Sequence, residues 1–354
     1  MRTAGPPQGA NAPLGGRELH AVSERGGKVS APRTRVQRRP VHGVLLLDKP
    51  IGLSSNDALQ KAKWLLRAEK AGHTGTLDPL ATGVLPLCFG AATKFSQLHL
   101  DADKTYETTV RLGVKTSTAD AEGEVISERP VTCTVGQVVE VLDRFMGPIT
   151  QVPPMHSALK KDGKALYEYA RAGEVVEREP RHVVIHDLEL LEMQLEGDSP
   201  FLRLRVTCSK GTYIRTLGED IAEALGCGGH LIALRRVATG PFVAADCVTL
   251  EDLTAMAEPA REARLMPVEC LLSDHTAVTL DAENAGRFLS GVRRRGTWTD
   301  QDRVCVFGEN PRALLGSAHV KAGELIPGRL LSPLEIQQIL ERSPANQPTL
   351  AEQA

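Results

Sequence analysis

Two stretches of the chain alternate apolar and polar residues in the way that a half-buried β-strand requires. Residues 104–112 and 201–208 each place every second side chain on one apolar face, a period of two that a helix does not produce. Apolar residues at helical spacing occur instead at 54–67, 135–146 and 214–225. The strands and helices do not alternate regularly, as they would in a doubly wound parallel sheet. We therefore expect an α+β fold with a mixed or antiparallel central sheet and flanking helices.

Composition divides the chain into four regions. Residues 1–40 contain eight Lys or Arg, two Glu and eleven Gly or Pro, which predicts a disordered basic leader with a net charge of +6. The rest of the chain has a net charge of −8. Residues 41–275 form the predicted main domain, with an insertion at about 150–200. Short strands with Gly-rich turns predict a small β-rich domain at 276–332, and a helix and tail follow at 333–354.

Several classes of protein are excluded by the patterns that the sequence lacks. No apolar run approaches the roughly 18–20 residues of a membrane span, and neither a dinucleotide-binding loop nor a P-loop occurs. The seven cysteines are scattered and odd in number, which is typical of reduced thiols. The nearest approach to a metal motif, Cys227-Gly-Gly-His230, has no second pair of ligands. We expect a cytoplasmic protein without metal, cofactor or membrane contact.

The segment Gly72–Gly83 is the densest signal for chemistry. Its sequence is Gly-His-Thr-Gly-Thr-Leu-Asp-Pro-Leu-Ala-Thr-Gly. Its glycines allow tight bends or close approach to a ligand. Pro79 biases Asp78 toward an extended backbone, so a rigid loop presents the carboxylate, with the His73 ring nearby. An Asp-Pro pair also starts ordinary turns, so these residues alone leave both a structural and a catalytic interpretation open.

This loop resembles the signature of the TruB family of bacterial tRNA pseudouridine synthases. Four further stretches agree with the family's motifs in the same order, Leu234-Arg235-Arg236 follows them, and the resemblance covers roughly residues 42–250. The four stretches are Leu47-Asp48-Lys49-Pro50 with Gly52 and Ser54-Ser55-Asn56; Asp103-Lys104 with Tyr106; Met155 with Ser157-Ala158-Leu159-Lys160; and Cys208-Ser209-Lys210-Gly211-Thr212-Tyr213-Ile214-Arg215.

The resemblance implies a reaction and a partner. Enzymes of this family convert uridine 55, in the T-loop of tRNA, to pseudouridine: uracil leaves its ribose, rotates, and is rejoined through carbon 5. The target base must first be flipped out of the RNA. We therefore expect a monomeric enzyme that binds tRNA and needs neither a cofactor nor a protein partner. The domain at 276–332 resembles a reduced RNA-binding domain of the PUA type.

The resemblance also assigns catalysis to three residues. Asp78 is the expected catalytic carboxylate and Arg215 its cationic partner, because a neighbouring guanidinium keeps a carboxylate ionised. Tyr106 is expected to stack on the target uracil, since a flat ring costs little entropy to order. From the residues alone, Tyr106 is predicted to be a core residue, because Val110 and Leu112 lie on the same strand face. The alternative for Arg215 is an exposed arginine in the first turn of a helix, which the helix dipole disfavours. A fixed anion nearby explains an arginine at that position better.

Other residues are expected to bind the RNA. By resemblance, Tyr213 lines the pocket and is a candidate for moving the proton at carbon 5, and Leu234 closes the pocket floor. His73 is expected to stack in the space that the flipped base leaves, or to hold the RNA loop open by stacking. Several basic side chains are candidates for phosphate contacts, although each is equally explained as a solvated charge: Lys49, Lys210, Arg235 and Arg236.

Two other functions suit the same fold. An RNA-binding or RNA-folding module without turnover would be indicated by loss of Asp78, Tyr106 or Arg215, and all three are present. A guide-RNA-dependent relative would share the chemistry, but the segment 163–170 and the region 150–200 resemble stand-alone bacterial enzymes.

A glycoside hydrolase is a third alternative, and it needs a second carboxylate facing Asp78. Asp48 and Asp120 are the nearby candidates, and neither lies in a motif that indicates a general acid.

Overall fold

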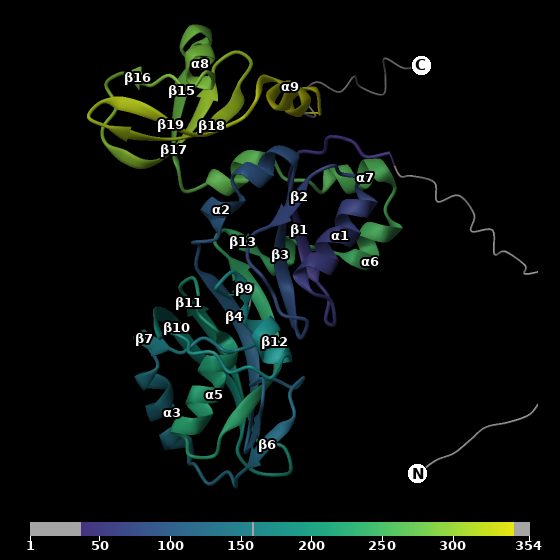
Figure 1. Ribbon diagram of the computed structural model, residues 1–354, viewed down its shortest axis with the longest axis vertical. Helices are drawn as coiled ribbons and strands as arrows, with labels where there is room; N and C mark the ends of the chain where they lie inside the picture. The colour runs from purple at the N-terminus through teal and green to yellow at the C-terminus, as the bar shows by residue number, and fades with distance from the viewer. Residues whose placement is uncertain (1–36, 158, 343–354) are drawn as a thin grey trace, which may run out of the picture. The chain divides into compact units, whose positions relative to one another are not determined.

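The computed structural model describes residues 37–157 and 159–342 (Figure 1). The predicted leader at 1–40 lies outside the described residues apart from 37–40, and so does the predicted tail after residue 342. Arg39, which precedes the expected start at Val41, already contacts the main domain. The Arg39 amide donates to the Arg67 carbonyl at 2.9 Å, and the Arg39 guanidinium pairs with Glu262.

A mixed sheet of ten strands forms the centre of the main domain. Its path is β14-β1-β3-β12-β4-β11-β10-β7, with β2 beside β3 and β13 beside β12. The β1–β14 and β3–β12 pairs are parallel and the other pairs are antiparallel, which confirms the predicted fold class. The strands are β1 (Gly43–Lys49), β2 (Ala71–His73), β3 (Ala81–Phe89), β4 (Lys104–Leu112), β7 (Gly147–Gln151), β10 (Arg181–Gln194), β11 (Phe201–Cys208), β12 (Gly229–Thr239), β13 (Phe242–Val243) and β14 (Val248–Thr249).

Helices pack apolar stripes onto this sheet. The first, α1 (Ser55–Leu65), begins after Ser54, whose hydroxyl accepts from the Asp57 amide at 3.1 Å, and such a cap satisfies a helix-end donor. Two further helices, α3 (Val135–Arg144) and α5 (Ile214–Ala224), lie near each other beside the sheet (Figure 1), and α5 carries Arg215. The shorter elements are η1 (Gly90–Lys94), α2 (Ser96–His99), α4 (Leu166–Arg171), η2 (Ala244–Asp246), α6 (Leu250–Ala255), α7 (Glu258–Ala263) and η3 (Val268–Leu272).

A second sheet has five strands in the order β15-β17-β18-β19-β16. One apolar cluster joins the two sheets, because Val44 and Leu46 of β1 belong to the same buried group as Phe307 and Leu314. The elements are β15 (Thr276–Leu280), α8 (Ala282–Leu289), β16 (Arg294–Arg295), β17 (Gln301–Gly308), β18 (Ala313–Lys321), β19 (Glu324–Leu330) and α9 (Pro333–Arg342).

The region predicted as an insertion, 150–200, contributes to the central sheet. Its second half contains β10, which pairs with β11 on one side and β7 on the other. Its first half contains a short hairpin and α4. Two small sheets complete the fold: β5 (Val114–Thr116) with β6 (Val125–Glu128), and β8 (Lys160–Lys161) with β9 (Lys164–Ala165). Within the described ranges, no helix is long and apolar enough to cross a membrane.

Candidate active site

Asp78 lies in the turn between β2 and β3, and its neighbours are tied down through the backbone. The Ser55 hydroxyl accepts from the Leu77 amide at 2.7 Å and donates to the Leu77 carbonyl at 3.0 Å. The Gly52 amide donates to the Pro79 carbonyl at 2.8 Å. Because the residues on both sides are held and Pro79 restricts the Asp78 backbone, the carboxylate is presented from a rigid loop.

Lys49 lies buried beneath this loop. Its side chain has no exposed surface, and its ammonium donates to the carbonyls of Pro50 at 2.9 Å, Leu53 at 2.6 Å and Pro79 at 3.4 Å. Burial lowers the pKa of Lys49 to about 8, although the charge of Asp78 opposes this effect. An enclosed ammonium cannot reach a phosphate, so the expected phosphate contact does not hold for Lys49, which instead braces the loop.

Arg215 connects Asp78 to the first turn of α5 and is 5% exposed. Its Nη2 lies 2.9 Å from the Asp78 carboxylate and donates to the His156 carbonyl at 2.7 Å. Its Nη1 donates to the Asp120 carboxylate at 3.2 Å and to the Thr118 carbonyl at 3.3 Å. Both arms of the planar fork are occupied, which fixes its orientation. The two carboxylates offset the unfavourable position of a cation at a helix N-terminus.

Asp120 is a site residue that the sequence analysis did not select. It is 2% exposed and accepts hydrogen bonds from the Thr118 hydroxyl at 2.5 Å and the Glu122 amide at 3.1 Å. From the sequence, Asp120 is only a candidate acid for glycoside hydrolysis. A buried carboxylate needs a cation or several hydrogen-bond donors. The burial of Asp120 depends on tertiary structure, so no pattern in the sequence indicates it.

The electrostatic environment of Asp78 combines opposing influences. Burial is the largest and raises the pKa of Asp78; Arg215 lowers it, Asp120 raises it and Lys49 lowers it. The Asp78 side chain is nevertheless 40% exposed. The carboxylate is therefore reachable by a ligand from one side and held by a cation on the other.

Two phenol rings lie near Asp78. Tyr106 projects from β4, and Tyr213 directly precedes α5. Burial raises the pKa of both phenols, and the charge of Asp78 adds to the rise. The Gln151 side chain holds the Tyr213 backbone, accepting from its amide at 3.0 Å and donating to its carbonyl at 3.2 Å. Four of the expected site residues thus gather in one place: Asp78, Arg215, Tyr106 and Tyr213.

The other expected binding residues lie in three different environments. Leu234 is 8% exposed and lies on β12, on the same face of the sheet as Tyr106 of β4. His73 ends β2, and its buried Nδ1 has no hydrogen-bond partner among the described residues. Lys210 is exposed and pairs with Asp101 at 2.8 Å. Of Leu234, His73 and Lys210, only Lys210 has an exposed positive charge that a phosphate could contact.

The two arginines that follow Leu234 lie on opposite faces of β12. Arg235 forms a bidentate pair with Asp48, with distances of 3.0 and 2.7 Å, and its side chain is 40% exposed. Arg236 is 1% exposed, and its Nε donates to the Val84 carbonyl at 2.7 Å. A phosphate contact therefore does not hold for Arg236, while the charge of Arg235 is already matched by a carboxylate.

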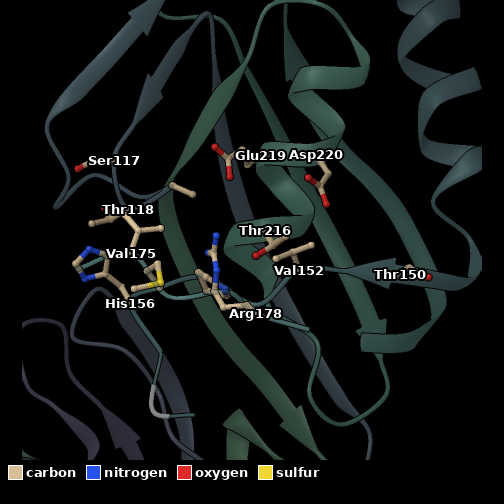
Figure 2. Close-up of a pocket in the computed structure, with 13 residues that line it drawn as sticks. Ser117, Thr118, Thr150, Val152, His156, Val175, Arg178, Thr216, Glu219 and Asp220 are labelled. Carbon is tan, nitrogen blue, oxygen red and sulfur yellow. The ribbon is translucent and has the colours of Figure 1, made fainter. Parts of the chain in front are cut away.

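A cavity of about 570 Å³ adjoins the carboxylate–guanidinium cluster. Its wall includes Thr118 and His156, whose backbone carbonyls bind Arg215. Figure 2 shows Glu219 and Asp220 of α5 on one side of the cavity and the His156 ring on the other. Neither Asp78 nor Arg215 lines this cavity, so it adjoins the site only through the residues that hold Arg215.

Comparisons with known proteins bear on the family of the chain. Residues 63–214 match the family model described as TruB family pseudouridylate synthase (N terminal domain), and residues 215–273 match the tRNA pseudouridylate synthase B C-terminal domain. The tRNA pseudouridine synthase B of Verminephrobacter eiseniae is 62% identical over 320 residues, which cover 90% of this chain and 97% of the relative. The protein of the same name from Ralstonia pickettii is 61% identical over 303 residues, covering 83% and 95%.

Solved structures give the same result for the fold. A chain in the crystal structure of a Cbf5-Nop10-Gar1 complex is 26% identical, with a TM-score of 0.63, and the match covers 85% of this chain and 87% of that chain. With curated relatives near 60% identity across most of their length, the chain belongs to the TruB family of pseudouridine synthases.

Proposed function

We propose that this chain converts uridine 55, in the T-loop of tRNA, to pseudouridine and needs no cofactor to do so. Pseudouridine formation in tRNA follows from membership of the family, while the position and the catalytic residues are our proposal. The observation that carries it is the 2.9 Å contact between the Asp78 carboxylate and the Arg215 guanidinium, beside two phenol rings.

The reaction exchanges one glycosidic bond for another. The bond from ribose carbon 1 to ring nitrogen 1 breaks, a bond to ring carbon 5 forms, and the proton of carbon 5 is lost while nitrogen 1 gains one. A carboxylate can attack the sugar, attack the ring or remove a ribose proton. All three routes need the ionised form of Asp78. Arg215 favours that form when a bound base excludes water.

The remaining roles follow from position. We assign Tyr106 to stacking on the flipped uracil, Leu234 to the pocket floor, and Tyr213 to the pocket wall and the carbon 5 proton. His73 is assigned to stacking inside the RNA loop, and Lys210 to a phosphate contact. We also propose that the chain acts as a monomer in the cytoplasm without a protein partner. Residues 276–332 are proposed to form a PUA-like RNA-binding domain.

The two alternatives are less well supported. Binding of RNA alone does not require a carboxylate that is paired with a buried guanidinium and also accessible to a ligand. The matched chain from the Cbf5-Nop10-Gar1 complex is 26% identical to this chain, whereas the relatives named tRNA pseudouridine synthase B are 57–62% identical. This difference favours a stand-alone enzyme over a guide-RNA-dependent one.

The proposed function is tested with an unmodified tRNA transcript that carries tritium at uridine carbon 5. Incubation with the protein alone should release tritium, and mapping of the product should place pseudouridine at position 55. Release without a modification at position 55 would refute the assigned position. No release from a transcript that a characterised pseudouridine synthase does modify would refute the proposed function.

Tyr106→Leu is expected to lower the single-turnover rate by at least about 10²-fold and the tRNA affinity by no more than about tenfold. The reason is that stacking on one base contributes only ~1–3 kcal/mol to binding, whereas a misplaced base fails to react. Tyr106→Phe retains the ring and is the matched control, with a much smaller loss. The two variants are compared by rapid-quench kinetics and filter binding, and an unchanged rate for Tyr106→Leu would contradict the stacking role.

Deleting residues 2–36 is expected to make tRNA affinity less dependent on salt. This segment contains six Lys or Arg and two Glu. Each phosphate contact contributes about 0.7–0.9 to the slope of log affinity against log salt, so we expect the slope to flatten by roughly 1 to 4. The measurement is tRNA binding at several salt concentrations, with a leader in which the six cations are replaced by Gln as a control for length. Identical slopes would show that residues 2–36 do not contact RNA.

A further inference from the structure

Arg236 is a buried cation that the roles assigned above leave unused. It is 1% exposed and forms no ion pair within residues 37–157 and 159–342. Its Nε donates to the Val84 carbonyl at 2.7 Å, while its Nη2 is buried and has no hydrogen-bond partner among residues 37–157 and 159–342. Enclosing a guanidinium without a carboxylate partner is costly. Proteins tolerate such local costs mainly at functional sites.

The register of the sheet places Arg236 beside Tyr106. On β12, Arg236 pairs with Tyr106 of β4 on one side and with Gly83 of β3 on the other. Residues that pair directly on neighbouring strands project to the same face of a sheet, so the guanidinium and the phenol ring share one face. Gly83 has a φ of +99°, and a Cβ there would come within 2.1 Å of the Arg236 carbonyl oxygen. Glycine is therefore required for this close approach.

The far end of Arg236 reaches the loop that carries Asp78. Its Nη1 lies 3.4 Å from the position that a Cβ on Gly75 would occupy, three residues before Asp78. The charge of Arg236 also affects the pKa of a side chain on each side of it, Tyr106 and His73. Burial raises the pKa of Tyr106 and Arg236 opposes that rise; burial lowers the pKa of His73 and Arg236 adds to the fall. Arg236 thus lies between the stacking ring and the catalytic loop.

We propose that Arg236 is a positioning residue for the isomerisation: anchored on the Val84 carbonyl, its guanidinium fixes the Tyr106 ring relative to the Gly75 end of the catalytic loop. The inference rests on the proposed function, because it concerns the ring that we assign to uracil stacking. A planar guanidinium can contact both neighbours at once, whereas a lysine ammonium is a single point of charge. Since Arg236 has almost no surface, its loss should affect the chemical step and leave RNA affinity unchanged.

The test compares Arg236→Lys with Arg261→Lys. Arg261 is a matched control because it also donates to backbone carbonyls, those of Leu253, Leu65 and Thr254, and none of these belongs to the site. We expect Arg236→Lys to lower the single-turnover rate about 10- to 100-fold, with a Kd for tRNA within about twofold of wild type. Arg261→Lys should change neither quantity. An unchanged rate for Arg236→Lys, or a rate loss matched by an equal rise in Kd, would overturn the proposal.

A double-mutant cycle distinguishes positioning from a general loss of stability. In a Tyr106→Leu background the ring is already absent, so Arg236→Lys should cost less than about twofold in rate, because coupled residues are not additive. A full additive loss would mean that Arg236 does not act through Tyr106.

A spectroscopic readout tests the same contact without turnover. The chain has four tyrosines, so the ring resonances of Tyr106 can be assigned by ¹³C labelling and Tyr106→Phe. Arg236→Lys should shift them, Arg261→Lys should not, and unshifted Tyr106 resonances in Arg236→Lys would refute the positioning role. If the wild type made no pseudouridine, the proposed function would fail, and this measurement would still decide whether Arg236 holds the ring.

Discussion

Asp78→Asn is expected to bind tRNA within a few-fold of wild type and to form no measurable pseudouridine, a loss of at least about 10⁴-fold in rate. Asn has nearly the same shape as Asp, and the contacts that hold the loop are made by Ser55, by Lys49 and by backbone groups. The pocket should therefore persist. What disappears is the negative charge opposite Arg215, which every route from uridine to pseudouridine requires.

The fold should tolerate this substitution. Asp120 remains as a carboxylate partner for Arg215 at 3.2 Å, and removing the Asp78 charge relieves the repulsion between the two carboxylates. We expect the melting temperature to change by only a few degrees. Asp252→Asn, in the exposed first turn of α6, is a matched control that should keep full activity. Normal turnover by Asp78→Asn would remove Asp78 from the mechanism, and a rate loss explained by lost affinity would make it a binding residue.

The sequence predicted the strands that have one buried face and one solvent-exposed face. The bounds of β4 and β11 follow from strict alternation, because burial of one face imposes a period of two. Strand β12 was not predicted. It carries two adjacent arginines and has register shifts between Leu231 and Ala233 and between Arg236 and Ala238, so its residues do not keep a regular period.

The site shows a similar division. The pairing of Asp78 with Arg215 was expected from the resemblance to a family and could not have been derived from spacing, because the two residues lie on different elements far apart in the chain. The limit of prediction from sequence is clearest for three charged residues of the site: Lys49, Asp120 and Arg236. Charged side chains are ordinarily exposed, and these three are buried because tertiary contacts enclose them. Their burial therefore cannot be predicted from the neighbouring residues in the sequence.

Arg215→Lys is expected to lower the single-turnover rate by roughly 10²- to 10³-fold while tRNA affinity stays within about threefold. The guanidinium uses separate arms to reach Asp78 and Asp120, and it also holds the carbonyls of Thr118 and His156. One ammonium cannot make these contacts together, so the carboxylate loses its fixed direction although the positive charge remains. The measurement is rapid-quench kinetics at saturating enzyme. A rate equal to wild type would show that only the charge of Arg215 matters.

The pH dependence separates the charge of Arg215 from its geometry. The reactive form of Asp78 is the carboxylate, so the rate falls as the pH drops through its pKa. Burial raises that pKa, Arg215 lowers it and Asp120 raises it. Arg215→Met removes a lowering influence, so the acid limb of the pH–rate profile should move to higher pH, whereas Arg215→Lys should leave it nearly in place. Asp120→Asn removes a raising influence and should move the limb to lower pH. If the limb stayed fixed in both Arg215→Met and Asp120→Asn, the titrating group would not be Asp78.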